Sequence, residues 1–276
     1  MTEIANRRYK PERAVTARTV VLDFLSNRGT REIPARTVLA AGALFGFSEQ
    51  NLRMALARLV EEGVAANSGR GRYRLAPPAA AMRAEVRKWK HVADLVRPWN
   101  GEWIVVVGTE ISRADRAALR RHERAIRLRG LREFMPGLWI RPANLRDTIP
   151  ELRAHLATLG LHRKALVAAL SGLDAGATAR AARLWNTAAM RREYSELCAA
   201  LEASRERVPR LPLEMAAIET MLLGRDVIRH INLDPLLPEE LMPQRYLHEL
   251  VRAMITYDEI GREVWRRVMR RIENRK

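Results

Sequence analysis

Residues Phe45–Leu75 read FGFSEQNLRMALARLVEEGVAANSGRGRYRL. Ser48 is a favourable N-cap for a helix, and Gly63 is placed where that helix should end. Between them, apolar residues recur at helical spacing and predict one narrow buried stripe, formed by Leu52, Leu56, Leu59 and Val60. After Gly63, two short runs around NSGRG predict a small basic hairpin, from Val64 to Ala66 and from Arg72 to Leu75.

Two further helices are predicted before this stretch. Thr16–Asn27 has apolar residues at helical spacing, and so does Ile33–Leu44, with Pro34 near its first helical position. Three helices followed by a basic hairpin are typical of a winged helix-turn-helix domain, which we expect over residues 14–78. Residues 1–13 are expected to form a short basic arm.

The side of the third helix opposite the apolar stripe has the side chains that a base-reading helix needs. Gln and Asn can pair bidentately with adenine and Arg with guanine. We therefore predict that three residues read base edges and that Arg58 contacts the backbone or groove wall; the readers are Gln50, Asn51 and Arg53. Cations in the hairpin are predicted to share one strand face and contact phosphates: Arg70, Arg72 and Arg74. The alternative for the hairpin is a solvated basic turn.

The charge balance favours a polyanionic partner. The 276 residues contain 49 Lys/Arg and 32 Asp/Glu, a net charge of +17. Residues 1–92 hold 17 Lys/Arg against 8 Asp/Glu, so more than half of the excess lies in the first third. Basic domains attract nucleic acid or anionic membranes. A bias towards Arg along the whole chain is the alternative for part of this charge.

Cysteine usage and hydropathy indicate the compartment. Cys198 is the only cysteine, which rules out an intramolecular disulfide framework and fits a reducing cytosol. The sequence contains no apolar run of 18 residues, so no membrane partner is expected. We therefore expect a cytoplasmic protein.

The remaining chain predicts a linker and two further domains. A basic linker helix is expected within residues 79–98, at Met82–Val96. Residues 99–175 then read as strand, helix, strand, strand, helix, strand, which is the ferredoxin-like order. The strands are expected at 103–108, 132–135, 138–141 and 164–170, and the helices at 112–128, capped by Ser112, and 144–159. The run at 164–170 could also be helical on propensity alone.

Residues 176–276 are predicted to form a helical C-terminal domain, with helices at 177–206, 212–231, 244–256 and 258–274. The fold class is therefore mainly α with a small α+β part.

No catalytic constellation is evident in the sequence. Glycine-rich segments lack the Lys-Ser/Thr of a phosphate-binding loop, and Ser171-Gly172 does not lie in a nucleophile elbow. The six histidines show neither HxxxH nor HExxH spacing, so no metal site is predicted. We expect no cofactor and no enzymatic activity.

Several blocks together resemble the PaaX family of bacterial transcriptional regulators, the repressors of phenylacetate degradation operons. The blocks are FGFSEQNLRMALARLVEEG, GRGRYRL, PWNGEWIVVV, GLREFMPGLWIRPANL and DPLLPEELMP, in family order. The resemblance implies a winged helix domain, a central Cas2-like ferredoxin fold and a helical C-terminal domain. It also implies a homodimer on a pseudo-palindromic double-stranded DNA operator. In founding members of the family, phenylacetyl-CoA releases the repressor.

A CoA-thioester effector would be negatively charged, so its site should contain cations. Four arginines around the central domain are the candidates, although solvated surface arginines are the alternative for each: Arg127, Arg129, Arg132 and Arg141. We therefore expect a repressor of a catabolic operon that is released by an acyl-CoA or aryl-CoA thioester. Two other functions stay open: an enzyme built on the central domain (a nuclease or thioester hydrolase), and a non-specific nucleic-acid-binding protein.

Overall fold

The computed structural model describes residues 15–27, 31–77, 79–80, 87–108, 111 and 115–274. The expected basic arm at 1–13 and most of the expected linker helix lie outside these residues. The chain is mostly helical, with small antiparallel sheets and a helical C-terminal part. It divides into two compact units, each built from several segments. Unit 1 contains Met1–Lys90, Leu197–Ile228 and Arg252–Lys276, and unit 2 contains His91–Glu196 and Arg229–Val251.

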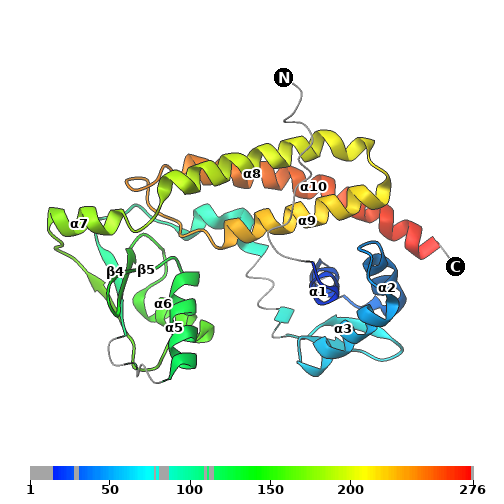
Figure 1. Cartoon of the computed structure of the whole chain (residues 1–276), viewed down its shortest axis with the longest axis horizontal. Helices are drawn as coiled ribbons and strands as arrows, with labels where there is room; N and C mark the ends of the chain where they lie inside the picture. The colour runs from blue at the N-terminus through cyan, green and yellow to red at the C-terminus, as the bar shows by residue number, and fades with distance from the viewer. Residues whose placement is uncertain are drawn as a thin grey trace. The chain divides into compact units, whose positions relative to one another are not determined.

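Unit 1 begins with three helices and a hairpin (Figure 1). The helices are α1 (Ala17–Asn27), α2 (Ala35–Ala43) and α3 (Glu49–Glu61), and the hairpin strands are β2 (Ala65–Asn67) and β3 (Arg72–Leu75). The predicted helices and hairpin are thus confirmed within a few residues. The predicted stripe of α3 contributes to one core with α1, α2 and both strands, except that Val60 is only half-buried; the core includes Val21, Leu25, Val38, Leu52, Leu56, Leu59 and Leu75.

The start of the second predicted helix is wrong. Ile33–Pro34 form a short strand, β1, which pairs with β3, so the sheet order is β1-β3-β2. Pro34 is the N-cap of α2, with an extended backbone (φ −61°, ψ 140°). A proline disfavours the α conformation of the residue before it, and this explains why Ile33 is extended. Strand β3 therefore lies in the centre of a three-stranded sheet.

The C-terminal helices differ from the prediction in two places. The predicted helix at 177–206 is divided into α7 (Ala175–Ala182) and α8 (Thr187–Arg207). The buried Trp185 lies in the break, where its indole N–H donates to the carbonyl oxygen of Gly130 at 3.2 Å. After η2 (Val208–Arg210) and α9 (Leu213–Asn232), one helix, α10 (Arg245–Asn274), replaces the two that were predicted.

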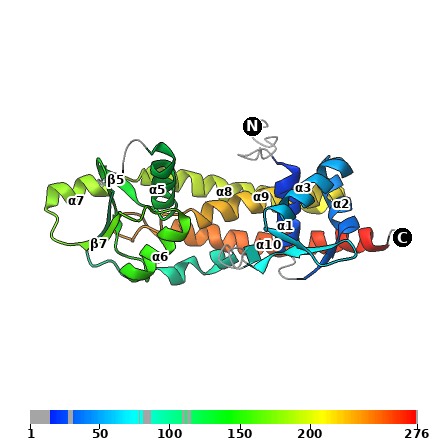
Figure 2. The same cartoon turned by 90° about the horizontal axis from the view of Figure 1, so that it is seen from below.

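A tertiary contact lies at the point where α10 was expected to break. Tyr257, which was expected between two helices, is buried within α10 and shares a hydrogen bond of 2.7 Å with Ser204 of α8. Arg207 and Glu219 form an ion pair of 2.6 Å beside it and link α8 to α9. The unit 1 segments of the three long helices thus pack together (Figure 2).

An aromatic cluster joins the N-terminal helices to α10 within unit 1. The rings of Phe24 and Trp265 meet edge to face, with centroids 4.9 Å apart, and Phe45 stacks on Trp265 at 6.3 Å. The Trp265 indole N–H also donates to the carbonyl of Ala217 at 3.1 Å. Residues more than 200 positions apart therefore share one core.

Unit 2 contains a four-stranded antiparallel sheet with the order β5-β6-β4-β7. Helices α5 and α6 cover one face of this sheet (Figure 1). The strand interpretation of 164–170 is confirmed for Leu166–Leu170, which pairs with β4. The elements are β4 (Trp103–Val107), α5 (Arg116–Leu128), β5 (Arg132–Met135), β6 (Leu138–Pro142), α6 (Ile149–Leu159) and β7 (Leu166–Leu170).

Three boundaries in unit 2 are corrected. Helix α5 is capped by Asp115, whose carboxylate accepts from the N–H of Ala118 at 2.9 Å, whereas the predicted cap Ser112 lies outside the described residues. Helix α6 begins at Ile149 and not at Asn144, because Thr148 and Glu151 form a capping box there. The described end of the predicted linker is η1 (Arg87–Leu95), a 3₁₀ segment that is kinked at His91 and runs from unit 1 into unit 2. Among the described residues, no helix combines the length and apolar character needed to cross a membrane.

Candidate nucleic-acid interface

The predicted reading face of α3 is open to solvent. Gln50, Asn51, Arg53 and Arg58 are all exposed. The orientation of this face is fixed because the opposite side of α3 is buried in the core of unit 1. At the start of the helix, Ser48 Oγ accepts a hydrogen bond of 3.3 Å from the N–H of Asn51. The first turn is thus held in place without using the Asn51 side-chain amide.

Arg53 has an intramolecular partner that the sequence analysis did not assign. Its guanidinium forms an ion pair of 2.6 Å with Glu49, one turn earlier. Both side chains are exposed, by 63% and 65% respectively. An exposed pair at this spacing contributes only about 0.3–0.5 kcal/mol. Arg53 can therefore exchange this carboxylate for another acceptor at small cost.

The hairpin arginines do not form the single row that was predicted. Arg72 and Arg74 lie in β3, but Arg70 lies in the turn, with a left-handed backbone (φ 49°) between two glycines that also have positive φ. Arg72 Nε donates to Glu32 at 3.1 Å. Arg74 is half-buried. Its Nη1 lies 3.4 Å from the carbonyl oxygen of Leu75. Arg70 and Arg72 are consequently the two most accessible cations of the hairpin.

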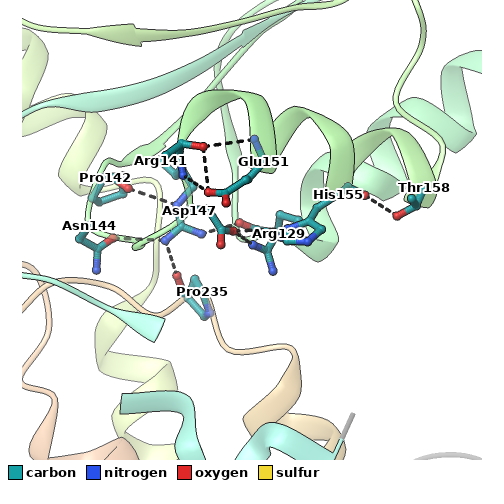
Figure 3. A network of polar contacts seen from close by, with 10 residues as sticks. Arg129, Arg141, Pro142, Asn144, Asp147, Glu151, His155, Thr158 and Pro235 are labelled. Atoms are coloured by element: carbon teal, nitrogen blue, oxygen red, sulfur yellow. Dashed lines mark hydrogen bonds and ion pairs between the residues drawn. The ribbon is translucent and has the colours of Figure 1, made fainter. Parts of the chain in front are cut away.

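Of the four arginines predicted for an effector, Arg141 is completely committed to the protein interior. Its guanidinium donates to the carbonyl oxygens of Arg129 (2.6 Å), Pro235 (3.0 Å) and Pro142 (3.2 Å), and to Asn144 Oδ1 (3.2 Å) (Figure 3). Burial lowers the pKa of Arg141 to about 9, with a smaller contribution from the charge of Arg129. Arg141 therefore joins the sheet to the segment at Pro235 and offers no donor to solvent.

The other three arginines differ in what they contact. Arg129 is ion-paired with Asp147. Arg127 is exposed and lies over the ring of Trp139, 4.9 Å from its centroid. Burial lowers the pKa of Arg132, and the charge of Arg127 lowers it further. The structure thus brings Arg127 and Arg132 into electrostatic contact, while Arg129 and Arg141 belong to an internal network.

Asp234 is a half-buried carboxylic acid to which the sequence assigned no role. It accepts hydrogen bonds from Tyr194 and from the N–H of Leu236, the latter at 2.6 Å. Burial raises the pKa of Asp234 to about 7, although the Leu236 bond and Arg141 oppose this effect. A cavity of about 20 Å³ adjoins it, enough for about one water molecule. The only feature of the sequence that pointed to Asp234 was the DPLLP motif at residues 234–238. Leu236 of this motif has a left-handed backbone (φ 51°).

The comparisons with known proteins agree with this architecture. Residues 185–267 match the PaaX-like protein C-terminal domain. Among solved structures, the uncharacterized protein Rv0674 from Mycobacterium tuberculosis is similar with a TM-score of 0.58 and 24% sequence identity; the match covers 90% of this chain and 100% of that chain. At this identity the likeness supports the fold alone. No curated protein matches the chain. The segment 185–267 is therefore a PaaX-like C-terminal domain, and the PaaX family is in general a family of transcriptional regulators.

Proposed function

We propose that the chain is a cytoplasmic, sequence-specific DNA-binding protein that represses a catabolic operon. The observation that carries this proposal is the exposed face of α3, where amide and guanidinium side chains lie beside a basic hairpin in the same domain. Three helices followed by a sheet with β3 at its centre support the interpretation of residues 14–78 as a winged helix-turn-helix domain.

The remaining domains are proposed on topology. The strand order β5-β6-β4-β7, with one helix after the first strand and one after the third, supports a ferredoxin-like domain at 99–175. A linker at 79–98 would precede it, and a helical domain at 176–276 would follow.

Each interface residue has a proposed role. Gln50, Asn51 and Arg53 read base edges, and Arg58 contacts the groove wall. Arg70 and Arg72 bind phosphates, with Arg74 in a supporting position because it is half-buried. A homodimer would place two α3 helices about 34 Å apart, or a multiple of that distance, on a pseudo-palindromic operator. Footprinting on the DNA upstream of the gene tests this proposal; the absence of a protected site would contradict it.

Arg53→Ala is expected to weaken operator binding by about 1–3 kcal/mol and to relax specificity at one base pair, because a bidentate contact to guanine is lost. Binding to a panel of single-base operator variants measures both effects. Glu49→Gln is the matched control: it removes the partner of Arg53 but keeps the guanidinium. This variant should bind the operator at least as tightly as the parent. An equal loss for Arg53→Ala on operator and on random DNA would rule out base reading.

Arg72→Ala is expected to weaken binding similarly on all DNA sequences. Since a phosphate contact releases about one counterion, the slope of log K against log salt should become shallower by roughly 1. Titrations at several salt concentrations measure the slope. Arg205→Ala, which removes an exposed arginine of α8 paired with Glu202, should leave the slope unchanged. The same slope for Arg72→Ala and the parent would show that Arg72 of the hairpin does not contact a phosphate.

We propose that a small-molecule effector releases the repressor, and that its class is an acyl-CoA or aryl-CoA thioester, as the family resemblance implies. Arg127 and Arg132 are the remaining candidates for its anionic groups, because an anion would relieve the repulsion between the two guanidiniums. Release requires tighter binding of the effector to the DNA-incompetent state. Footprinting in the presence of a panel of acyl-CoAs tests this; persistent protection with every member would contradict it.

A further inference from the structure

An open groove of about 460 Å³ lies where the first half of α8 meets the start of α10 in unit 2. The groove is wide open to solvent, so a ligand would be held by the side chains along it and not by enclosure. The groove is lined by Ala188, Arg191, Arg192, Ser195, Glu196 and Tyr246. None of these residues was singled out by the sequence analysis.

The groove is electropositive. Arg191 and Arg192 are exposed, and Glu196 is the only carboxylate in the lining. Arg245 adds a third guanidinium, which lies over the ring of Tyr246 with its carbon 4.9 Å from the centroid. In the part of the chain that the structure describes, no carboxylate lies within ion-pair distance of Arg191 or Arg192. With two guanidiniums against the one carboxylate of Glu196, the lining has a net positive charge.

The hydroxyl group of Tyr246 lies close to two of these guanidinium groups. Its hydroxyl oxygen accepts a hydrogen bond of 3.2 Å from Arg245 Nη2. The hydrogen bond and charge of Arg245, together with Arg191, lower the pKa of Tyr246. A phenol oxygen is a weak acceptor for two guanidinium groups, each of which carries five N–H donors. An anion with several oxygens would satisfy these donors better.

We propose that this groove binds the phosphate group of a small organic phosphate. Guanidinium forks match phosphate oxygens bidentately. Arg191 and Arg192 line the groove from α8, and Arg245 of α10 contacts its Tyr246. The Tyr246 ring and Ala188 offer an apolar wall for the organic part of the ligand. The proposal does not rest on DNA binding by α3.

Calorimetric titration of the full chain with inorganic pyrophosphate tests the site. The double variant Arg191→Gln/Arg192→Gln should bind pyrophosphate at least tenfold more weakly than the parent. Arg120→Gln/Arg121→Gln is the matched control, since these two adjacent arginines are also exposed on a helix of unit 2 but lie outside the groove. The control should bind like the parent. Absence of saturable binding to the parent, or an equal loss in both double variants, would overturn the proposal.

A second measurement uses Tyr246 as a spectroscopic probe. The difference between the alkaline absorbance titrations of the parent and Tyr246→Phe isolates this phenol. Bound pyrophosphate should raise the pKa of Tyr246, because a nearby anion opposes formation of the phenolate. An unchanged titration in saturating pyrophosphate would place the ligand elsewhere. Loss of affinity for random duplex DNA by the Arg191→Gln/Arg192→Gln variant would assign these cations to a nucleic-acid surface and also overturn the proposal.

Discussion

Arg141→Ala is expected to lower the free energy of unfolding by about 3 kcal/mol or more. The substitution removes the donor for four oxygens, on Arg129, Pro142, Asn144 and Pro235. Each buried acceptor left without a partner costs about 1–3 kcal/mol. The loss should be concentrated in unit 2, because all five residues belong to it.

Urea unfolding followed by tryptophan fluorescence measures this loss. Arg141→Met is the companion variant, since it keeps most of the side-chain volume and removes only the donors; it should be almost as unstable as Arg141→Ala. Arg127→Ala removes an exposed arginine of the same unit and should cost less than about 1 kcal/mol. A loss below about 1 kcal/mol for both Arg141 variants would contradict the network in Figure 3.

Asp234 is expected to make the stability of the protein fall as the pH rises from about 4 to about 7. The pKa of its carboxylic acid is raised from 3.8 to about 7, chiefly by burial. Because the folded state disfavours the ionised form, the protonated Asp234 contributes to the free energy of unfolding. This contribution is fully present below pH 3.8 and is lost as the pH rises through 7. The difference corresponds to about 4 kcal/mol.

Asp234→Asn tests this expectation, because an amide keeps an acceptor for the N–H of Leu236 but does not titrate. The parent should lose stability between pH 4 and pH 7 relative to the variant, and the two curves should run parallel above pH 8. Tyr194→Phe, which removes one donor to Asp234, should keep the same pH dependence or steepen it. Parallel curves for parent and Asp234→Asn from pH 4 to pH 8 would show that Asp234 is ionised throughout.

Much of the local structure follows from local rules. Ser48, the stripe at Leu52, Leu56 and Leu59, and Gly63 defined α3 because capping and helical periodicity need only neighbouring residues. The misplaced helix starts have a similar local reason. Thr148 with Glu151 forms a stronger N-terminal signal than Asn144, and Pro34 extends the residue before it.

The candidate interface was only partly predictable. The amide and guanidinium side chains of α3 could be placed on an exposed face from periodicity alone. The turn position of Arg70 and the half-buried state of Arg74 depend on turn geometry and on neighbours in space. The Glu49 partner of Arg53 lies four residues earlier in the same helix, so helical spacing already allows this pair. For the effector arginines, residue type indicated positive charge. It did not indicate that the guanidinium of Arg141 donates to four internal acceptors.

The sequence by itself determined where most of the helices and strands lie, the basic character of the N-terminal third and the family resemblance. Periodicity, caps and composition act over a few residues and can be read along the chain. Only the tertiary structure decided that Trp265 joins the core of Phe24 and Phe45, that Tyr194 donates to Asp234, and that Arg191 approaches Tyr246. These contacts join residues 40 to more than 200 positions apart, and their energy comes from burial and charge that exist only once the chain has folded.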